Sequence, residues 1–237
     1  MSLSFIQNNL KEIVNHIETL KAQYSLKQNM KLLAISKTFS EDYILEAFKN
    51  NQTLFGENKV QEAEIKINSS TLLPLNLEWH LVGRLQSNKA KKAVSLFSHI
   101  HSVDSLKLAT KLSQYAVELQ KPLSILLQIN TSLEESKQGY PPNLSFLTEE
   151  AHQIAQLPFL KLTGLMTIGP LSKDEKKVQK SFEQLRILKE DLNTALPQLN
   201  LTELSVGMSN DYPLALKEGA TYIRVGSLIF GKRNYSL

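Results

Sequence analysis

Apolar residues recur along this chain with two different periods. Residues 4–24 place apolar side chains at intervals of three and four, which predicts an amphipathic helix at the start of the chain. Beyond it, short and nearly continuous apolar runs alternate with longer amphipathic stretches. The eight runs are KLLAIS (31–36), TLFGE (53–57), LEWHLVG (77–83), HIHSV (99–103), LSILLQIN (123–130), LKLTGLMTI (160–168), LTELSV (201–206) and ATYIRVGS (220–227).

The apolar runs have the length of strands, and the stretches between them have the length of helices. Alternating strands and helices predict parallel pairing through right-handed crossovers, and near-continuous apolar strands predict a sheet covered on both faces. We therefore expect one α/β domain, residues 1–237, folded as a (β/α)8 TIM barrel with an extra N-terminal helix. An open doubly wound sheet is the alternative, although no run is followed by a G-x-G-x-x-G fingerprint. The helices are expected to begin near potential capping residues, namely Ser40, Asn58, Ser87, Ser105, Asn143, Asp174 and Asp211.

Composition narrows the possible functions. The chain has 237 residues, 42% of them hydrophobic, which is enough for a full core. It has no cysteine, and its five histidines show no tight ligand spacing, so we expect no metal site. The first residues contain neither a signal-peptide core nor a membrane span, which predicts a cytoplasmic protein. The net charge of +4 is small, and the basic cluster Lys89, Lys91 and Lys92 has no interleaved aromatic residues, so no nucleic-acid partner is expected.

Polar residues collect where the predicted strands end, and in α/β barrels the active site lies at those ends. The seventh run leads into SVGMSND (205–211), and the eighth contains VGS (225–227). Glycine lets backbone N–H groups approach a ligand closely, serine donates a hydroxyl, and a helix N-terminus favours negative charge. Together the two turns predict a phosphate site, although either one alone is more often an ordinary tight turn.

Lys37 directly follows the first predicted strand, so its amine is expected near the mouth of the barrel. A lysine acts as a nucleophile near neutral pH when burial or a nearby cation lowers its pKa from about 10.4. Arg224, at the end of the eighth run, is a candidate for that cation. Two other interpretations are a lysine that pairs with phosphate and a surface lysine at a strand exit. His80 lies inside the third run and, taken alone, is more typical of a core histidine than of a catalytic base.

Eight segments taken together resemble a known family. They are LLAISK (32–37), FGENKVQE (55–62), EWHLVGRLQSNKAK (78–91), IHSVDSLKLA (100–109), LLQINTSLEESKQGY (126–140), LTGLMTIGP (162–170), LSVGMSNDYPLAL (204–216) and YIRVGSLIFGKRNY (222–235). In this order they are similar to the YggS/PROSC family of pyridoxal phosphate homeostasis proteins. The departures from the usual pattern are Lys59, Gln138, Val206 and Leu228.

The resemblance implies a barrel like the N-terminal domain of alanine racemase, with pyridoxal 5'-phosphate as its cofactor. By the same resemblance, Lys37 forms an imine with the cofactor aldehyde and Arg224 faces the pyridine nitrogen. The other contacts that it implies are Ser209, Gly226 and Ser227 at the phosphate with Ser205 nearby, and Asn58, His80 and Met166 at the ring.

An arginine beside the pyridine nitrogen disfavours its protonation, which weakens the ring as an electron sink. Racemisation also needs acid–base groups on both faces of the substrate. The chain ends at Leu237, so we expect no second domain of the alanine racemase kind. We therefore expect a non-catalytic monomer that holds the cofactor and passes it to apo-enzymes. One alternative is a small racemase-like enzyme that uses His80 or Tyr235, and another is an aldolase that forms a Schiff base without a cofactor and binds a sugar phosphate.

Overall fold

The predicted strands form a closed parallel barrel. The computed structural model describes residues 3–134 and 136–232. Each strand pairs with the next along the chain, and β1 pairs with β8, so the sheet closes and the open-sheet alternative is wrong. The strands are β1 (Lys31–Ile35), β2 (Leu54–Glu57), β3 (Glu78–Leu81), β4 (His99–Val103), β5 (Leu123–Gln128), β6 (Leu160–Met166), β7 (Glu203–Met208) and β8 (Tyr222–Val225).

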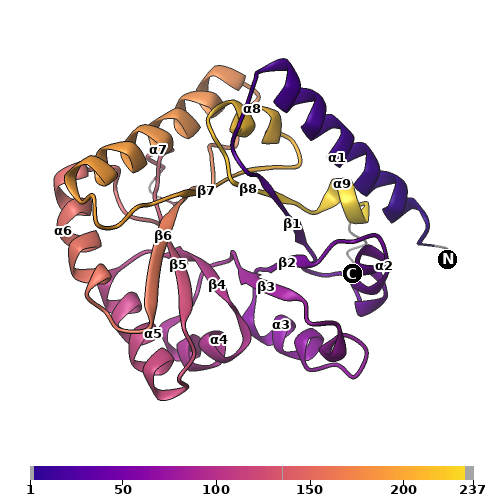
Figure 1. Ribbon diagram of the computed structural model, residues 1–237, viewed down its shortest axis with the longest axis horizontal. Coiled ribbons are helices and arrows are strands. Elements are labelled where there is room, and N and C mark those ends of the chain that lie inside the picture. The colour runs from indigo at the N-terminus through magenta and orange to yellow at the C-terminus, as the bar shows by residue number, and fades with distance from the viewer. Residues whose placement is uncertain (1–2, 135, 233–237) are drawn as a thin grey trace.

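Helices surround the barrel (Figure 1). Three of the expected capping residues accept hydrogen bonds from the first turn of their helix, namely Ser105, Asn143 and Asp174. The helices are α1 (Phe5–Gln23), α2 (Glu41–Lys49), α3 (Val60–Ile67), α4 (Ala90–Leu96), α5 (Leu106–Glu118), α6 (Leu144–Ala155), α7 (Glu175–Ala195), α8 (Tyr212–Lys217) and α9 (Ser227–Phe230), with short 3-10 turns at η1 (Leu73–Leu75) and η2 (Ser87–Lys89). Within the described ranges, no helix is long and apolar enough to cross a membrane.

The N-terminal helix completes the outer ring. Helix α9, which follows β8, has only four residues and is too short to cover the barrel there. Helix α1 has 19 residues and packs against α2, α8 and α9, in the gap that the short helix leaves (Figure 1). Its buried face consists of Ile6, Leu10, Ile13, Ile17 and Leu20.

Apolar packing fills two regions of different size. The larger region lies between the sheet and the helices and includes Phe55 and Trp79, whose rings are 5.5 Å apart. The smaller region consists of Leu33, Ile35 and Val82, and it belongs to the interior of the barrel. Much of the remaining interior is polar, because β3, β4, β7 and β8 direct charged and hydrogen-bonding side chains inward.

Candidate functional site

A cavity of about 1160 Å³ opens at the carboxyl ends of the strands. Its walls come from the ends of β1, β2, β3 and β8, from the loops after β6 and β7, and from α7 and α8. This is the end of an α/β barrel where ligands bind. Six of the nine residues expected at the cofactor line the cavity: Lys37, Asn58, Ser209, Arg224, Gly226 and Ser227.

Arg224 places a buried positive charge at the cavity. The residue is 6% exposed, and its guanidinium donates to Ser205 Oγ at 2.8 Å and to the Thr167 carbonyl at 2.7 Å. Burial lowers the pKa of Arg224 to about 10, against the opposing effect of Asp211. The side chain therefore stays charged at neutral pH and is held in one orientation as a hydrogen-bond donor.

The two serine–glycine turns depend on their glycines. Gly207 has a φ of +90°, and a Cβ there would lie 2.5 Å from the Ala215 Cβ. At Gly226 a Cβ would lie 3.1 Å from the Ile35 carbonyl oxygen. Neither glycine therefore has room for a side chain, and the backbone of both turns packs directly against its neighbours. Ser209 and Ser227 contribute hydroxyl groups to the same cavity. Such a combination suits a phosphate.

Buried and partly buried side chains fix the backbone on both sides of Lys37. Ser36 Oγ donates to Glu57 Oε1 at 2.7 Å, and Lys66 Nζ donates to the Ser36 carbonyl at 2.8 Å. On the other side, the Thr38 N–H donates to Glu62, and the φ of Thr38 is +69°. The turn that carries Lys37 is therefore held in place by α3 and by the end of β2.

Lys66 joins these contacts into one network. Its ammonium lies 2.7 Å from Glu57 Oε1 and 2.7 Å from Glu62 Oε1. Burial raises the pKa of Glu57, although Lys66 acts to lower it, and Glu57 Oε2 has no hydrogen-bond partner within the described part of the chain. Sequence reasoning missed this network, although the i,i+4 spacing of Glu62 and Lys66 on one helix is a signal for the pair.

The other three expected residues, Ser205, His80 and Met166, are fully buried and are not among the described residues that line the cavity. The reason is their position along the strands. The cavity begins at Val82, just after β3, and at Ile168, just after β6, which are two residues further along the chain than His80 and Met166. Two residues of a strand span roughly 7 Å, so His80 and Met166 lie one layer deeper. Tyr235 lies outside the described residues.

A chain of hydrogen bonds runs from the cavity through the barrel interior. Arg224 donates to Ser205 Oγ, which lies 2.8 Å from His101 Nδ1. His101 Nε2 lies 2.9 Å from His80 Nδ1, and His80 Nε2 lies 2.9 Å from Glu78 Oε1. The bond between β4 and β7 crosses the barrel, because those strands are not neighbours in the sheet.

The hydrogen-bonded chain has a charged group at each end, Arg224 and Glu78, and these two groups set the direction of every hydrogen bond between them. Burial lowers the pKa of both His80 and His101, so both rings are neutral near pH 7. Glu78 only accepts, so His80 carries its proton on Nε2; His101 then carries its proton on Nε2, and Ser205 donates to His101 Nδ1. Arg224 therefore donates to the oxygen of Ser205, whose hydroxyl hydrogen points toward His101.

Sequence reasoning also missed His101 and the clustering of histidines. His80, His99 and His101 lie together, with ring centroids 4.2 to 6.4 Å apart. The signals were Glu78-x-His80 and His99-x-His101, because residues two apart on a strand point to the same face. Three of the five histidines that look scattered along the sequence are therefore gathered in the fold.

Comparisons with known proteins agree with this fold. The sequence profile described as alanine racemase, N-terminal domain, matches residues 3–234. The pyridoxal phosphate homeostasis protein of Haemophilus influenzae is 42% identical over 232 residues, which are 98% of this chain and 97% of that protein. The chain belongs to the family of pyridoxal phosphate homeostasis proteins.

Solved structures extend this relationship. The structure of PipY from Synechococcus elongatus PCC7942 with PLP bound is 42% identical in sequence and superposes with a TM-score of 0.83. The match covers 95% of this chain and 100% of PipY. The alanine racemase of Streptomyces coelicolor A3(2) has a TM-score of 0.74 at 16% identity and covers 97% of this chain but 58% of the racemase. The chain therefore shares its barrel with the racemases, and at this identity the likeness concerns the fold alone.

Proposed function

We propose that this protein binds pyridoxal 5'-phosphate in the cavity and stores it for transfer, without catalytic turnover. The observation that carries the proposal is one cavity that brings together a lysine amine, a buried guanidinium and two serine–glycine turns. When bound, the cofactor supplies an aldehyde that reacts with amines and a pyridine ring that accepts electrons. The lysine amine, the guanidinium and the two turns match the aldehyde, the ring nitrogen and the phosphate of the cofactor, respectively.

Each lining residue has a role in this proposal. Lys37 holds the aldehyde, and Arg224 donates a hydrogen bond to the pyridine nitrogen. The phosphate is bound by Ser209, Ser227 and the close backbone at Gly226, while Asn58 lines the ring. The remaining expected residues lie one layer deeper, where Ser205 and His80 support the arginine through hydrogen bonds and Met166 packs in the interior.

The charge of Arg224 favours storage over turnover. A guanidinium has no lone pair to accept a proton, and its positive charge disfavours protonation of a neighbouring pyridine nitrogen. The ring therefore stays a weak electron sink. The names of the curated relatives, which refer to homeostasis of the cofactor, support the same proposal. We further propose that the protein acts as a cytoplasmic monomer and delivers the cofactor to apo-enzymes.

Absorbance spectroscopy tests the binding step. The purified protein, incubated with pyridoxal 5'-phosphate, is expected to show a visible band that is absent from Lys37→Ala. Lys173→Ala is the matched control, because Lys173 lines the same cavity and the band should remain. Borohydride reduction followed by mass measurement should add the mass of the reduced cofactor at Lys37. A wild-type protein that stays colourless contradicts the proposal, and a sugar-derived mass on Lys37 favours an aldolase instead.

The shared fold supports a second candidate, a small racemase-like enzyme. The two functions differ in whether the α-hydrogen of an amino acid is exchanged. A panel of amino acids incubated with the loaded protein in deuterium oxide should show no exchange above that of free cofactor if the protein only stores it. Exchange that is far faster and is lost in Lys37→Ala establishes the enzyme.

A further inference from the structure

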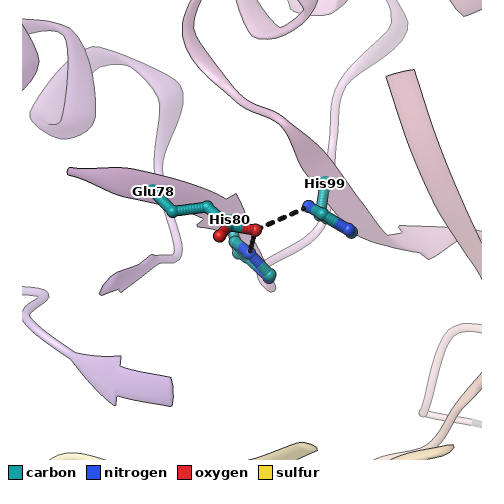
Figure 2. A group of neighbouring side chains, drawn as sticks. All are labelled: Glu78, His80 and His99. Atoms are coloured by element: carbon teal, nitrogen blue, oxygen red, sulfur yellow. Dashed lines mark hydrogen bonds and ion pairs between the residues drawn. The ribbon is translucent and has the colours of Figure 1, made fainter. Parts of the chain in front are cut away.

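The amino ends of β3 and β4 carry a second cluster of chemically capable side chains, at the opposite end of the barrel from the cavity. Glu78 and His99 are the first residues of their strands, and His80 lies one layer further in. Glu78 Oε1 is 2.9 Å from His80 Nε2 and 3.3 Å from His99 Nδ1. Figure 2 shows the carboxylate facing both rings, and the three atoms lie within 4.8 Å of one another.

These three side chains have the composition of a transition-metal site. Two imidazoles and one carboxylate form a common ligand set for Zn²⁺, whose bonds to nitrogen and oxygen measure about 2.0–2.2 Å. In a tetrahedral site, ligand atoms at that distance are about 3.4 Å from one another. The two separations to Glu78 Oε1 are within about half an ångström of that value. Burial also lowers the pKa of His80 and His99, which leaves both rings in the neutral form that binds metals.

The hydrogen-bond partners of both histidines are compatible with metal binding, but the two rings are stacked 4.2 Å apart at 15°, so one ring must turn before both nitrogens face the same ion. A metal-binding histidine usually has its second ring nitrogen hydrogen-bonded, and His80 Nδ1 lies 2.9 Å from His101 Nε2. With a metal on Nε2, His80 carries its proton on Nδ1 and donates it to His101, whose own proton then moves from Nε2 to Nδ1, facing Ser205 Oγ. Ser98 Oγ lies 3.0 Å from His99 Nδ1, and it has a second acceptor in the Trp79 carbonyl at 3.2 Å. The serine can therefore release His99 Nδ1 to an ion.

The cluster is open to solvent on one side. The side chain of Glu78 is 39% exposed and that of His99 is 15% exposed, whereas His80 is fully buried. Lys31 and Glu203 lie nearby and form a pair at 3.9 Å, so their charges offset one another. An ion can reach the carboxylate from the solvent without displacing the barrel core, and water can occupy the fourth position.

We propose that Glu78, His80 and His99 form a binding site for one divalent transition-metal ion of the Zn²⁺ class, completed by water. This site is separate from the cofactor cavity, so it does not depend on the proposed storage function. In this structure Glu78 is hydrogen-bonded to His80 and lies 3.3 Å from His99 Nδ1.

Metal titration of the untagged full-length protein, freed of metal with EDTA and kept free of pyridoxal 5'-phosphate, tests the proposal. Calorimetry with Zn²⁺ should give one ion per chain. Co²⁺ should produce the intense visible absorption of a tetrahedral site, and Zn²⁺ should abolish it. Glu78→Gln and His99→Asn should each weaken Zn²⁺ binding by at least about tenfold, because even residues that only orient metal ligands contribute about 10- to 100-fold.

The matched control is His152→Asn, which removes an exposed histidine on α6 and should leave the affinity unchanged. Circular dichroism identifies any variant that fails to fold, and either of the two variants keeps the test decisive if the other fails to fold. The proposal is wrong if the wild type binds Zn²⁺ no more tightly than His99→Asn, or if His152→Asn weakens binding equally. The visible band of bound cofactor is a separate measurement, so failure here leaves the storage function standing.

Discussion

Lys66 is the residue on which the position of Lys37 most directly depends. Its ammonium bonds to Glu57, to Glu62 and to the Ser36 carbonyl beside Lys37. We expect Lys66→Met to lower the free energy of unfolding by about 3–5 kcal/mol, because it leaves the Glu57 carboxylate buried without a cation. It should also weaken cofactor binding, since the turn that carries Lys37 loses a support. Urea unfolding and cofactor titration measure the two effects.

The control for Lys66→Met is an exposed ion pair on the same side of the barrel. Lys92 Nζ lies 2.6 Å from Glu64 on α3, but their side chains are 51% and 37% exposed. Lys92→Met should cost less than about 1 kcal/mol, because exposed ion pairs contribute little. Equal losses in the two variants would show that burial of the Lys66 network does not matter.

Glu62 predicts a pH dependence of stability. Partial burial acts to raise its pKa, but hydrogen bonds from Lys66 and the Thr38 backbone outweigh this effect and hold the pKa below its ordinary value of 4.5. A carboxyl with a lowered folded pKa stabilises the protein above its unfolded pKa, and that contribution is lost as the pH falls through the folded pKa. Glu62→Gln should therefore cost about 1 kcal/mol at pH 7 and progressively less below pH 4.5.

Urea unfolding of wild type and Glu62→Gln at several pH values between 7 and 3 measures this difference. Glu57 titrates in both proteins, so its opposite shift largely cancels from the comparison. A difference in unfolding free energy that stays constant across that range contradicts the assignment.

The sequence predicts the residues at the strand ends better than those inside the barrel. The six expected residues that reach the cavity belong to strand ends or to the turns after them, such as Lys37 and Ser209. His80 and Ser205 stand inside their strands, and local sequence does not reveal how deep a layer of a closed barrel lies. The bond between Ser205 and His101 joins residues 104 apart along the chain, so no spacing rule predicts it, whereas the spacing of two between Glu78 and His80 is visible in the sequence.

Helix α1 carries a prediction at the level of the element. Ile17 is 1% exposed on the face that packs against the barrel, and Val14 on the same helix is 47% exposed. Ile17→Ala should lower the unfolding free energy by about 2–5 kcal/mol, because the cavity it creates lies where the ring has no other long helix. Val14→Ala should change it by less than about 0.5 kcal/mol. Thermal or urea unfolding compares them, and similar losses would show that α1 is only loosely attached.

The elements follow from local pattern, but their assembly does not. Strand β4 spans the same residues, His99–Val103, as the predicted run, because its apolar residues stand between polar flanks. The predicted strand at 201–206 lies two residues later as β7, because its boundaries depend on pairing with β6 and β8. Similarly, residues 4–24 predict a helix, but its place between α2 and α8 depends on closure of the whole barrel.

At the scale of the whole molecule, the hydrogen-bonded chain links the cavity to the opposite end of the barrel. Ser205 is its critical member, because it bonds both Arg224 and His101 at 2.8 Å and so joins β8, β7 and β4. Ser205→Ala leaves a buried donor and a buried acceptor without partners. We expect a loss of about 1–3 kcal/mol in unfolding free energy and roughly tenfold weaker cofactor binding, because the guanidinium is no longer held in place.

A second buried serine serves as a control that separates the effect on stability from the effect on cofactor binding. Ser113 on α5 is 3% exposed and donates to the Pro158 carbonyl at 2.7 Å, away from the barrel interior. Ser113→Ala should destabilise the protein by a similar amount while leaving cofactor affinity unchanged, because its bond to Pro158 lies outside the hydrogen-bonded chain. Urea unfolding and cofactor titration of both variants make the comparison. If both serine variants bind the cofactor as tightly as the wild type, the hydrogen-bonded chain contributes to stability alone. If only Ser205→Ala binds weakly, hydrogen bonds in the barrel interior contribute to cofactor affinity.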